Sequence, residues 1–252
     1  MKRESLYAEK VLTHTPVQNI NMLFWATIMF LIFGYFSQVQ AAPHFATLDK
    51  VNGEVVVLKS DGSPIANGKD GMPVRPGQIV KTSGPNAVTD VVLFDGSRIR
   101  LLPSSEARFS VKKKEEKHNI QIDLIAGKIF NAVQKNKKSG HYVVKTPSSV
   151  AGFKGKVFSA ELNKEQSVFM VQDGKLKVIN PHEKNRQAVY VTSMNKTTTQ
   201  AVQAPSESTP LSAEEIAMFD ILKDIEVDIK IDIQGDTESV IREDTSVPGA
   251  LE

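Results

Sequence analysis

The chain has no cysteine, and this absence alone removes several classes of chemistry. Disulfides, cysteine-based zinc sites, iron–sulfur clusters and thiol nucleophiles are all excluded. The five histidines are scattered through the sequence, without the four-residue spacing that places two ligands on one helix face. We therefore expect no metal site and no cofactor.

Catalytic motifs are missing as well. The sequence contains no Gly-x-Ser-x-Gly nucleophile elbow and no glycine-rich phosphate loop that opens a helix. Ser104 and Ser105 follow Pro103 in an expected turn, and Glu115 with Glu116 lies in an expected hairpin tip that is rich in lysine. Without a convergent acid, base or nucleophile, the chain is not expected to be an enzyme.

Long apolar runs are scarce, and the clearest one lies near the amino end. Residues 20–36 contain no charge and follow a short segment that carries Lys2, Arg3 and Lys10. This pattern predicts a membrane-targeting helix, with residues 1–41 forming a signal peptide cleaved after Ala41. The alternative is an uncleaved anchor whose basic end stays in the cytoplasm. Either interpretation predicts that residues 42–252 cross the membrane, into the periplasm or tethered to the inner membrane.

Helical periodicity is also lacking between residues 42 and 200, where short β-prone runs are separated by turn dipeptides. Asp-Gly pairs at Asp61, Asp70, Asp95 and Asp173 predict hairpin turns. Alternating or β-rich runs predict strands at residues 53–58, 79–81, 88–94, 98–102, 107–111, 120–125, 128–133, 141–145, 157–162, 168–171, 175–179 and 188–191. We expect an all-β domain over residues 42–200, either irregular and β-helix-like or sandwich-like.

A loose repeat of the form Gly-x-aliphatic runs through this domain. It begins at Gly53, Gly77, Gly127, Gly155 and Gly174, at unequal spacings. Each glycine is expected to form a turn that feeds a strand, with the aliphatic residue pointing inward. Around Thr146 and Pro147 the chain is expected to turn and to restart as a strand after Gly155.

Taken in order, these elements resemble the FecR domain of bacterial envelope proteins over residues 48–193. The residues that carry the resemblance at structural turns are Gly53, Gly77, Asp95, Gly96, Gly127, Thr146, Pro147, Gly155, Asp173 and Gly174. The best-known members of that family are iron-uptake regulators that control a sigma factor through a cytoplasmic helical segment. Only about 19 residues precede the apolar run here, too few for such a segment. We therefore expect a non-enzymatic binding or scaffold module of the envelope; the alternative is an accessory sensor or regulator of envelope signalling tethered to the inner membrane.

Charge is unevenly distributed along the chain. Residues 42–204 carry 25 Lys or Arg against 14 Asp or Glu, whereas residues 205–252 carry 3 against 13. The basic residues proposed to bind an anion are Lys112, Lys113, Lys114, Lys135, Lys137, Lys138, Lys154 and Lys156. The expected partners are an envelope protein or an anionic envelope polymer or lipid. Nucleic acid is not expected, because no aromatic residues interleave these lysines.

The carboxyl-terminal segment, residues 201–252, is expected to be a linker followed by an acidic tail. Residues 201–210 are rich in Pro, Ser and Thr, and Ser212 with Glu215 forms a predicted capping box for a short helix. Residues 225–233 alternate apolar and charged side chains, which fits a strand or a continued helix. Two outcomes remain open for this tail: partial disorder, or docking of the acidic tail on the basic domain.

Overall fold

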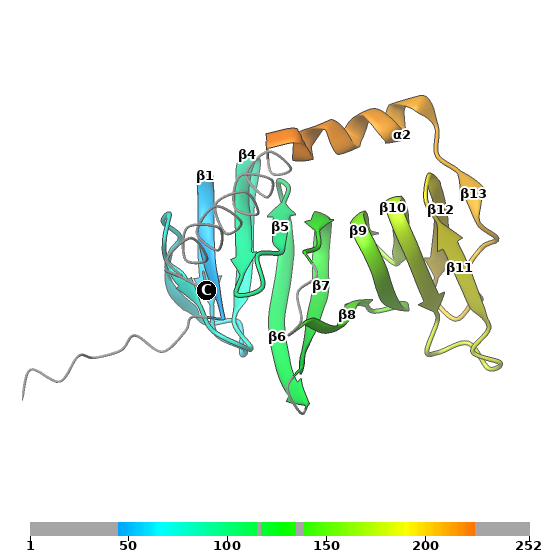
Figure 1. The fold of residues 1–252 in the computed structure, drawn as a ribbon. Coiled ribbons are helices and arrows are strands. Elements are labelled where there is room, and N and C mark those ends of the chain that lie inside the picture. Colours follow the sequence, from blue (N-terminus) through cyan, green and yellow to red (C-terminus); the bar gives the residue numbers. More distant parts are fainter. Residues whose placement is uncertain (1–44, 115–116, 135–138, 225–252) are drawn as a thin grey trace, which may run out of the picture. The chain divides into compact units, whose positions relative to one another are not determined.

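The computed structural model describes residues 45–114, 117–134 and 139–224, which are mostly β-strand (Figure 1). The all-β prediction is therefore confirmed for this part of the chain. The amino-terminal apolar run, Lys135, Lys137, Lys138 and the tail beyond residue 224 lie outside the described residues.

The strands follow one another with short connections. Their bounds are β1 (Ala46–Leu58), β2 (Pro64–Asn67), β3 (Pro73–Val74), β4 (Ile79–Leu93), β5 (Arg98–Leu101), β6 (Glu106–Lys114), β7 (Lys117–Ala132), β8 (Ser139–Thr146), β9 (Ser149–Asn163), β10 (Gln166–Ile179), β11 (Ala188–Thr192), β12 (Asn195–Gln200) and β13 (Thr209–Pro210). Every pairing between them is antiparallel except that of β7 with β8.

Long strands change partners partway along their length. The first part of β7 pairs with β6 and β8, whereas residues 127–132 pair with β5 and β9. Strand β10 pairs with β12 over residues 166–171 and with β11 over residues 175–179. The same exchange occurs in β1, β4 and β9, so the sheet folds into two layers that share these five strands.

The pairing defines the two layers. Layer I contains β3, β5, β12 and β13 with residues 46–49, 88–93, 127–132, 157–162 and 166–171 of the shared strands. Layer II contains β2, β6, β8 and β11 with residues 54–58, 79–83, 117–126, 149–154 and 174–179. Of the two expected forms, this arrangement corresponds to the sandwich, because a β-helix stacks its strands in parallel.

One apolar core lies between the layers. Ile99 and Phe169 enter it from layer I, and Val57, Phe109 and Ile122 enter it from layer II; all five side chains are fully buried. Burial of such side chains is the main driving force for closing the layers on each other, worth about 25 cal/mol per Å² of apolar surface.

Most of the repeated glycines lie inside strands and not in the predicted turns. Gly77 lies in a turn, but Gly53, Gly127, Gly155 and Gly174 lie inside strands, where the strands pass from one layer to the other. A Cβ atom on Gly155 would lie 2.4 Å from the Cα atom of Gly174, so glycine is required for the close approach of β9 and β10 at their common bend. These glycines therefore mark layer crossings rather than hairpin turns.

Two turn predictions fail in the same region. Asp173 lies within β10 at an irregularity of its pairing with β9, instead of in a hairpin turn. The chain does turn at Pro147, but the next strand begins at Ser149 and already contains Gly155. The Asp-Gly pairs that begin at Asp61, Asp70 and Asp95 do lie in turns.

Residues 201–224 return to the β domain instead of extending from it. Thr209 and Pro210, part of the expected linker, pair with β12 as β13. The predicted capping box is present: Ser212 and Glu215 satisfy each other's backbone N–H groups at the start of α2 (Ala213–Ala217). The 3-10 helix η1 (Met218–Leu222) continues it. We call residues 211–224 the strap, because they cross layer I from β12 towards β4 (Figure 1).

Candidate functional site

The lysines predicted to bind an anion fall into separate places. Lys112, Lys113 and Lys114 are exposed at the end of β6, whereas Lys154 and Lys156 are exposed at the bend of β9. Strands β7 and β8 lie between these two groups in the pairing order. Lys156 lies 3.8 Å from Asp173, an exposed pair that contributes little to stability. The anion-binding role of these lysines remains a prediction.

Among the residues that carry the family resemblance, Asp95 and Thr146 make hydrogen bonds in or beside turns. Asp95 is buried and its Oδ1 atom accepts a 3.0 Å hydrogen bond from the backbone N–H of Ser97, which closes the turn between β4 and β5. Thr146 Oγ1 accepts a 2.7 Å hydrogen bond from Ser167 at the end of β8. These contacts point to structural roles.

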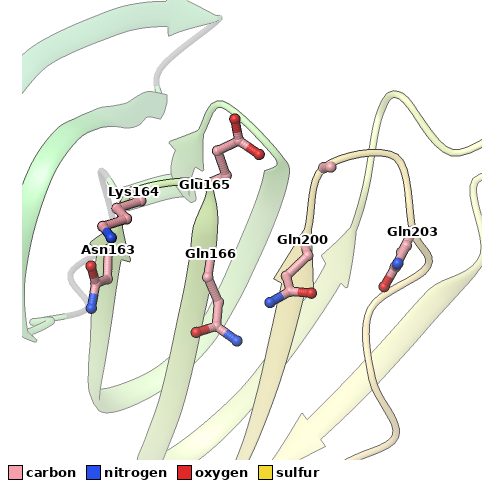
Figure 2. A pocket seen from close by; sticks show the side chains of 7 residues that line it. Asn163, Lys164, Glu165, Gln166, Gln200 and Gln203 are labelled. Carbon is pink, nitrogen blue, oxygen red and sulfur yellow. The ribbon is translucent and has the colours of Figure 1, made fainter.

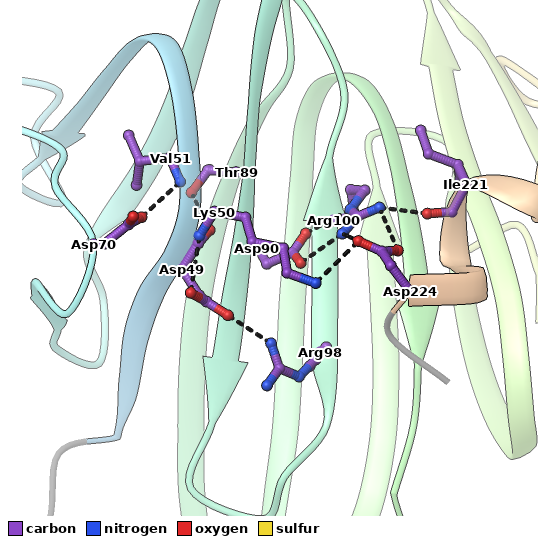
Figure 3. A network of polar contacts seen from close by, with 10 residues as sticks. All are labelled: Asp49, Lys50, Val51, Asp70, Thr89, Asp90, Arg98, Arg100, Ile221 and Asp224. Atoms are coloured by element: carbon purple, nitrogen blue, oxygen red, sulfur yellow. Dashed lines mark hydrogen bonds and ion pairs between the residues drawn. The ribbon is translucent and has the colours of Figure 1, made fainter. Parts of the chain in front are cut away.

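The most developed polar site on the described chain lies elsewhere, at Arg100 of β5 (Figure 3). Arg100 lies directly opposite Asp90 of β4. Its Nε atom donates to Asp90 Oδ1 over 2.7 Å and its Nη2 atom donates to Asp90 Oδ2 over 2.8 Å. The carboxylate of Asp90 is completely buried, so this two-pronged ion pair replaces the water that the charge has lost.

The same guanidinium holds the end of the strap. Nη1 and Nη2 donate to the two carboxylate oxygens of Asp224 over 3.0 and 2.9 Å, and Nη1 also donates to the carbonyl oxygen of Ile221. Lys50 Nζ lies 2.9 Å from Asp224 Oδ2. We call Arg100, Asp90, Asp224 and Lys50 the clasp.

In the clasp, Arg100 and Asp224 each stabilise the charged form of the other. Hydrogen bonds from Arg100 hold the pKa of Asp224 well below its usual range, against the opposing effect of partial burial, and Lys50 adds to the shift. Burial would lower the pKa of Arg100, but its hydrogen bonds to Asp90 and Asp224 outweigh burial and raise it. Arg100 and Asp224 are therefore both charged at neutral pH.

The rest of the strap is fixed by apolar and ionic contacts. Phe219 meets the ring of Phe130 edge-on at a centroid distance of 5.3 Å, and Leu222 is fully buried. At the opposite end from the clasp, Lys196 of β12 lies 2.6 Å from Glu215. The strap therefore covers an apolar strip of layer I and is held by ion pairs at both ends.

Sequence reasoning missed the clasp because its partners are far apart in the chain. Arg100 and Asp224 are separated by 124 residues. One local signal was present: the expected strand at residues 98–102 places Arg98 and Arg100 on one face and the buried Ile99 and Leu101 on the other.

A hollow opens at the turn between β9 and β10, beside the end of β12 (Figure 2). It is lined by Asn163, Lys164, Glu165, Gln166, Gln200, Ala201 and Gln203. Its side chains are mainly amides that donate and accept hydrogen bonds, with Glu165 as the single carboxylate. Over the described residues, no cluster of three or more His, Asp or Glu side chains is arranged to hold a metal ion.

Comparison with known proteins places the centre of this domain in a family. The family model described as FecR protein matches residues 80–177, from β4 to β10. Residues 80–177 therefore form a FecR domain. The FecR match includes Asp90 and Arg100 of the clasp and ends before the strap. It is narrower than the resemblance over residues 48–193 that the sequence suggested.

Two crystal structures, each described as "a putative anti-sigma factor from Parabacteroides distasonis ATCC 8503", are similar to this chain at 14% sequence identity and a TM-score of 0.45. The two alignments cover 56% and 55% of this chain and 63% and 62% of those chains, respectively. No curated protein matched the chain. None of the helices in the described part is both long and apolar enough to cross a membrane.

Proposed function

We propose that this protein regulates envelope signalling, with the FecR domain acting as a non-catalytic binding module. The observation that carries this proposal is the FecR match over the central strands β4 to β10. It favours the regulatory alternative over a scaffold without a signalling role. The domain faces the periplasm in this proposal, either released or tethered through the amino-terminal apolar run.

The strap is the element through which the domain transmits its state. Its contact with layer I depends on a small set of side chains, chiefly Phe219, Leu222 and the clasp residues. A ligand that binds the domain only when the strap is released would shift the equilibrium from the docked form towards the released form. The size of this shift is set by the difference between the ligand's affinities for the two forms. The released form would expose the apolar strip around Phe130 to a partner protein.

The test is a transcript profile in the cell that produces the protein. Deletion of the gene is expected to change a limited set of transcripts, and the wild-type chain is expected to restore them. Leu222→Asp, which releases the strap by placing a charge at a fully buried position, is expected to fail to restore them at equal protein level. The matched control is Ile216→Asp on the exposed side of the same strap, which should restore the profile. An unchanged profile after deletion would refute the regulatory role.

A further inference from the structure

The two-layer domain ends in four edge strands, and three of them carry proline. Pro64 lies in β2, Pro73 in β3 and Pro210 in β13. Proline has no N–H to donate, so it protects an edge from pairing with another chain. The fourth edge, β11, reads Ala-Val-Tyr-Val-Thr, and its pairing within the described residues is with β10 alone. It is β-prone, uncharged and without proline, which makes it the unprotected edge of the domain.

Positive charge is concentrated beside this edge. Lys175 and Lys177 of β10 lie opposite Thr192 and Tyr190 of β11. Their Nζ atoms lie 4.8 and 5.9 Å from the centroid of the Tyr190 ring, so both ammonium groups lean over the edge strand. Tyr190 is 53% exposed. Aromatic and cationic groups are thus presented together along the face of β11.

The arrangement of lysines is unfavourable for the isolated domain. Lys175 lies directly opposite Lys154 of β9, and like charges at opposed positions of antiparallel strands destabilise the pair. Within the described residues, none of the salt bridges involves Lys154, Lys175 or Lys177. An acidic strand beside β11 would relieve this repulsion.

The chain itself contains a segment of the required chemistry. Residues 225–233, IEVDIKIDI, alternate apolar residues with charged ones: Glu226, Asp228, Lys230 and Asp232 occupy every second position, so this set has a net charge of −2. Residues 225–252 carry eight acidic and two basic side chains. An extended segment with this pattern would present a mainly acidic face, with Lys230 as its one basic group, and an apolar face on the other side.

The position of Asp224 in the clasp indicates whether residues 225–233 reach β11 from the same chain or from a second copy. Asp224 is held at Arg100 of β5, and β7, β9 and β10 lie between β5 and β11 in the pairing order. Residue 225 of the same chain therefore starts several strands away from the unprotected edge. A second copy has no such restriction.

We propose that residues 225–233 of a second copy add a strand to β11, with their acidic side chains facing Lys175 and Lys177 and their apolar side chains continuing the core beside Val189 and Val191. Backbone hydrogen bonds supply affinity, and the alternating side chains supply specificity. The protein thus self-associates through its tail, independently of any signalling partner.

Cysteine trapping tests the contact directly, because the natural chain has no cysteine. Full-length Thr192→Cys is mixed with full-length Asp228→Cys under mild oxidation, and a disulfide-linked pair is expected. Lys59→Cys, at an exposed position after β1, replaces Thr192→Cys as the matched control and should give a much lower yield of the mixed pair. Equal yields, or no trapping, would overturn the proposal. The proposal would also be overturned if a chain that carries both Thr192→Cys and Asp228→Cys formed a disulfide within one molecule, at a rate independent of protein concentration.

A second measurement does not depend on oxidation. A labelled synthetic peptide of residues 225–233 is titrated with the full-length chain and followed by fluorescence anisotropy. The double variant K175E/K177E is expected to bind at least about tenfold more weakly, and the affinity of the wild type should fall with added salt. The double variant K59E/K69E, with the same charge change at exposed positions on either side of β2, is expected to bind like the wild type. Equal loss in both double variants would show a general charge effect and refute the site.

Discussion

At the scale of single residues, the clasp contains two carboxylates that share one guanidinium but differ in exposure. The side chain of Asp90 is 0% exposed, whereas that of Asp224 is 50% exposed. Removal of one member of a buried ion pair leaves an uncompensated buried charge, whereas an exposed partner is readily replaced by water. Asp90 is therefore expected to matter for the whole domain and Asp224 for the strap.

Asp90→Ala is expected to lower the free energy of unfolding by about 3–5 kcal/mol, and Asp224→Ala by about 1 kcal/mol or less. Urea unfolding followed by circular dichroism measures both values. Similar losses for the two variants would contradict the assignment of Asp90 as the buried anchor.

The clasp also predicts a pH dependence. The pKa of Asp224 is lower in the folded protein than in the unfolded chain, where a carboxylate titrates near pH 4. The unfolded chain therefore binds more protons as pH falls below about 4, and the contribution of Asp224 is present above that pH and is lost below it. The stability difference between the wild type and Asp224→Asn is expected to shrink from pH 6 to pH 2.5. A difference that stays constant over this range would show that the carboxylate is not held by Arg100 in solution.

At the scale of secondary-structure elements, the sequence predicted the strands better than their partners. Alternation located the strand segments because apolar side chains that face the core alternate with polar ones, as Ile99 and Leu101 alternate with Arg98 and Arg100. Alternation does not reveal that a strand bends and changes layer. In β9 the burial alternates over residues 149–154 and is almost continuous over residues 157–162, but neither pattern identifies the partner strand. The sequence predicted the capping box of the strap and left docking of the tail as one of two outcomes, but it did not identify Phe130 and Arg100 as the contacts, because they lie in distant strands.

The glycine bends provide a matched pair of substitutions within β9. Gly155→Ala is expected to destabilise the domain by about 1–3 kcal/mol, because its Cβ atom would collide with the backbone of Gly174. Gly152→Ala, three residues earlier, meets nothing within 4 Å and is expected to change stability by about 0.5 kcal/mol or less. Thermal and urea unfolding compare the two variants. Equal effects would mean that the bend tolerates a side chain.

At the scale of the whole molecule, the proposed exposure to the periplasm has a direct test. Ser60 lies in the exposed turn after β1, so Ser60→Cys introduces a single accessible thiol into a chain that has none. A membrane-impermeant maleimide, applied to cells with a permeabilised outer membrane, is expected to label Ser60→Cys without lysis. Labelling that requires lysis of the inner membrane would place the domain in the cytoplasm and refute the proposed topology.

The strands that pass through both layers have a further mechanical consequence. Because β1, β4, β7, β9 and β10 belong to each layer, unfolding of one layer would free half of each of these strands and expose the core face of the other layer. The domain is thus expected to lose its structure in one cooperative step, and a force applied to one layer is carried by continuous backbone into the other.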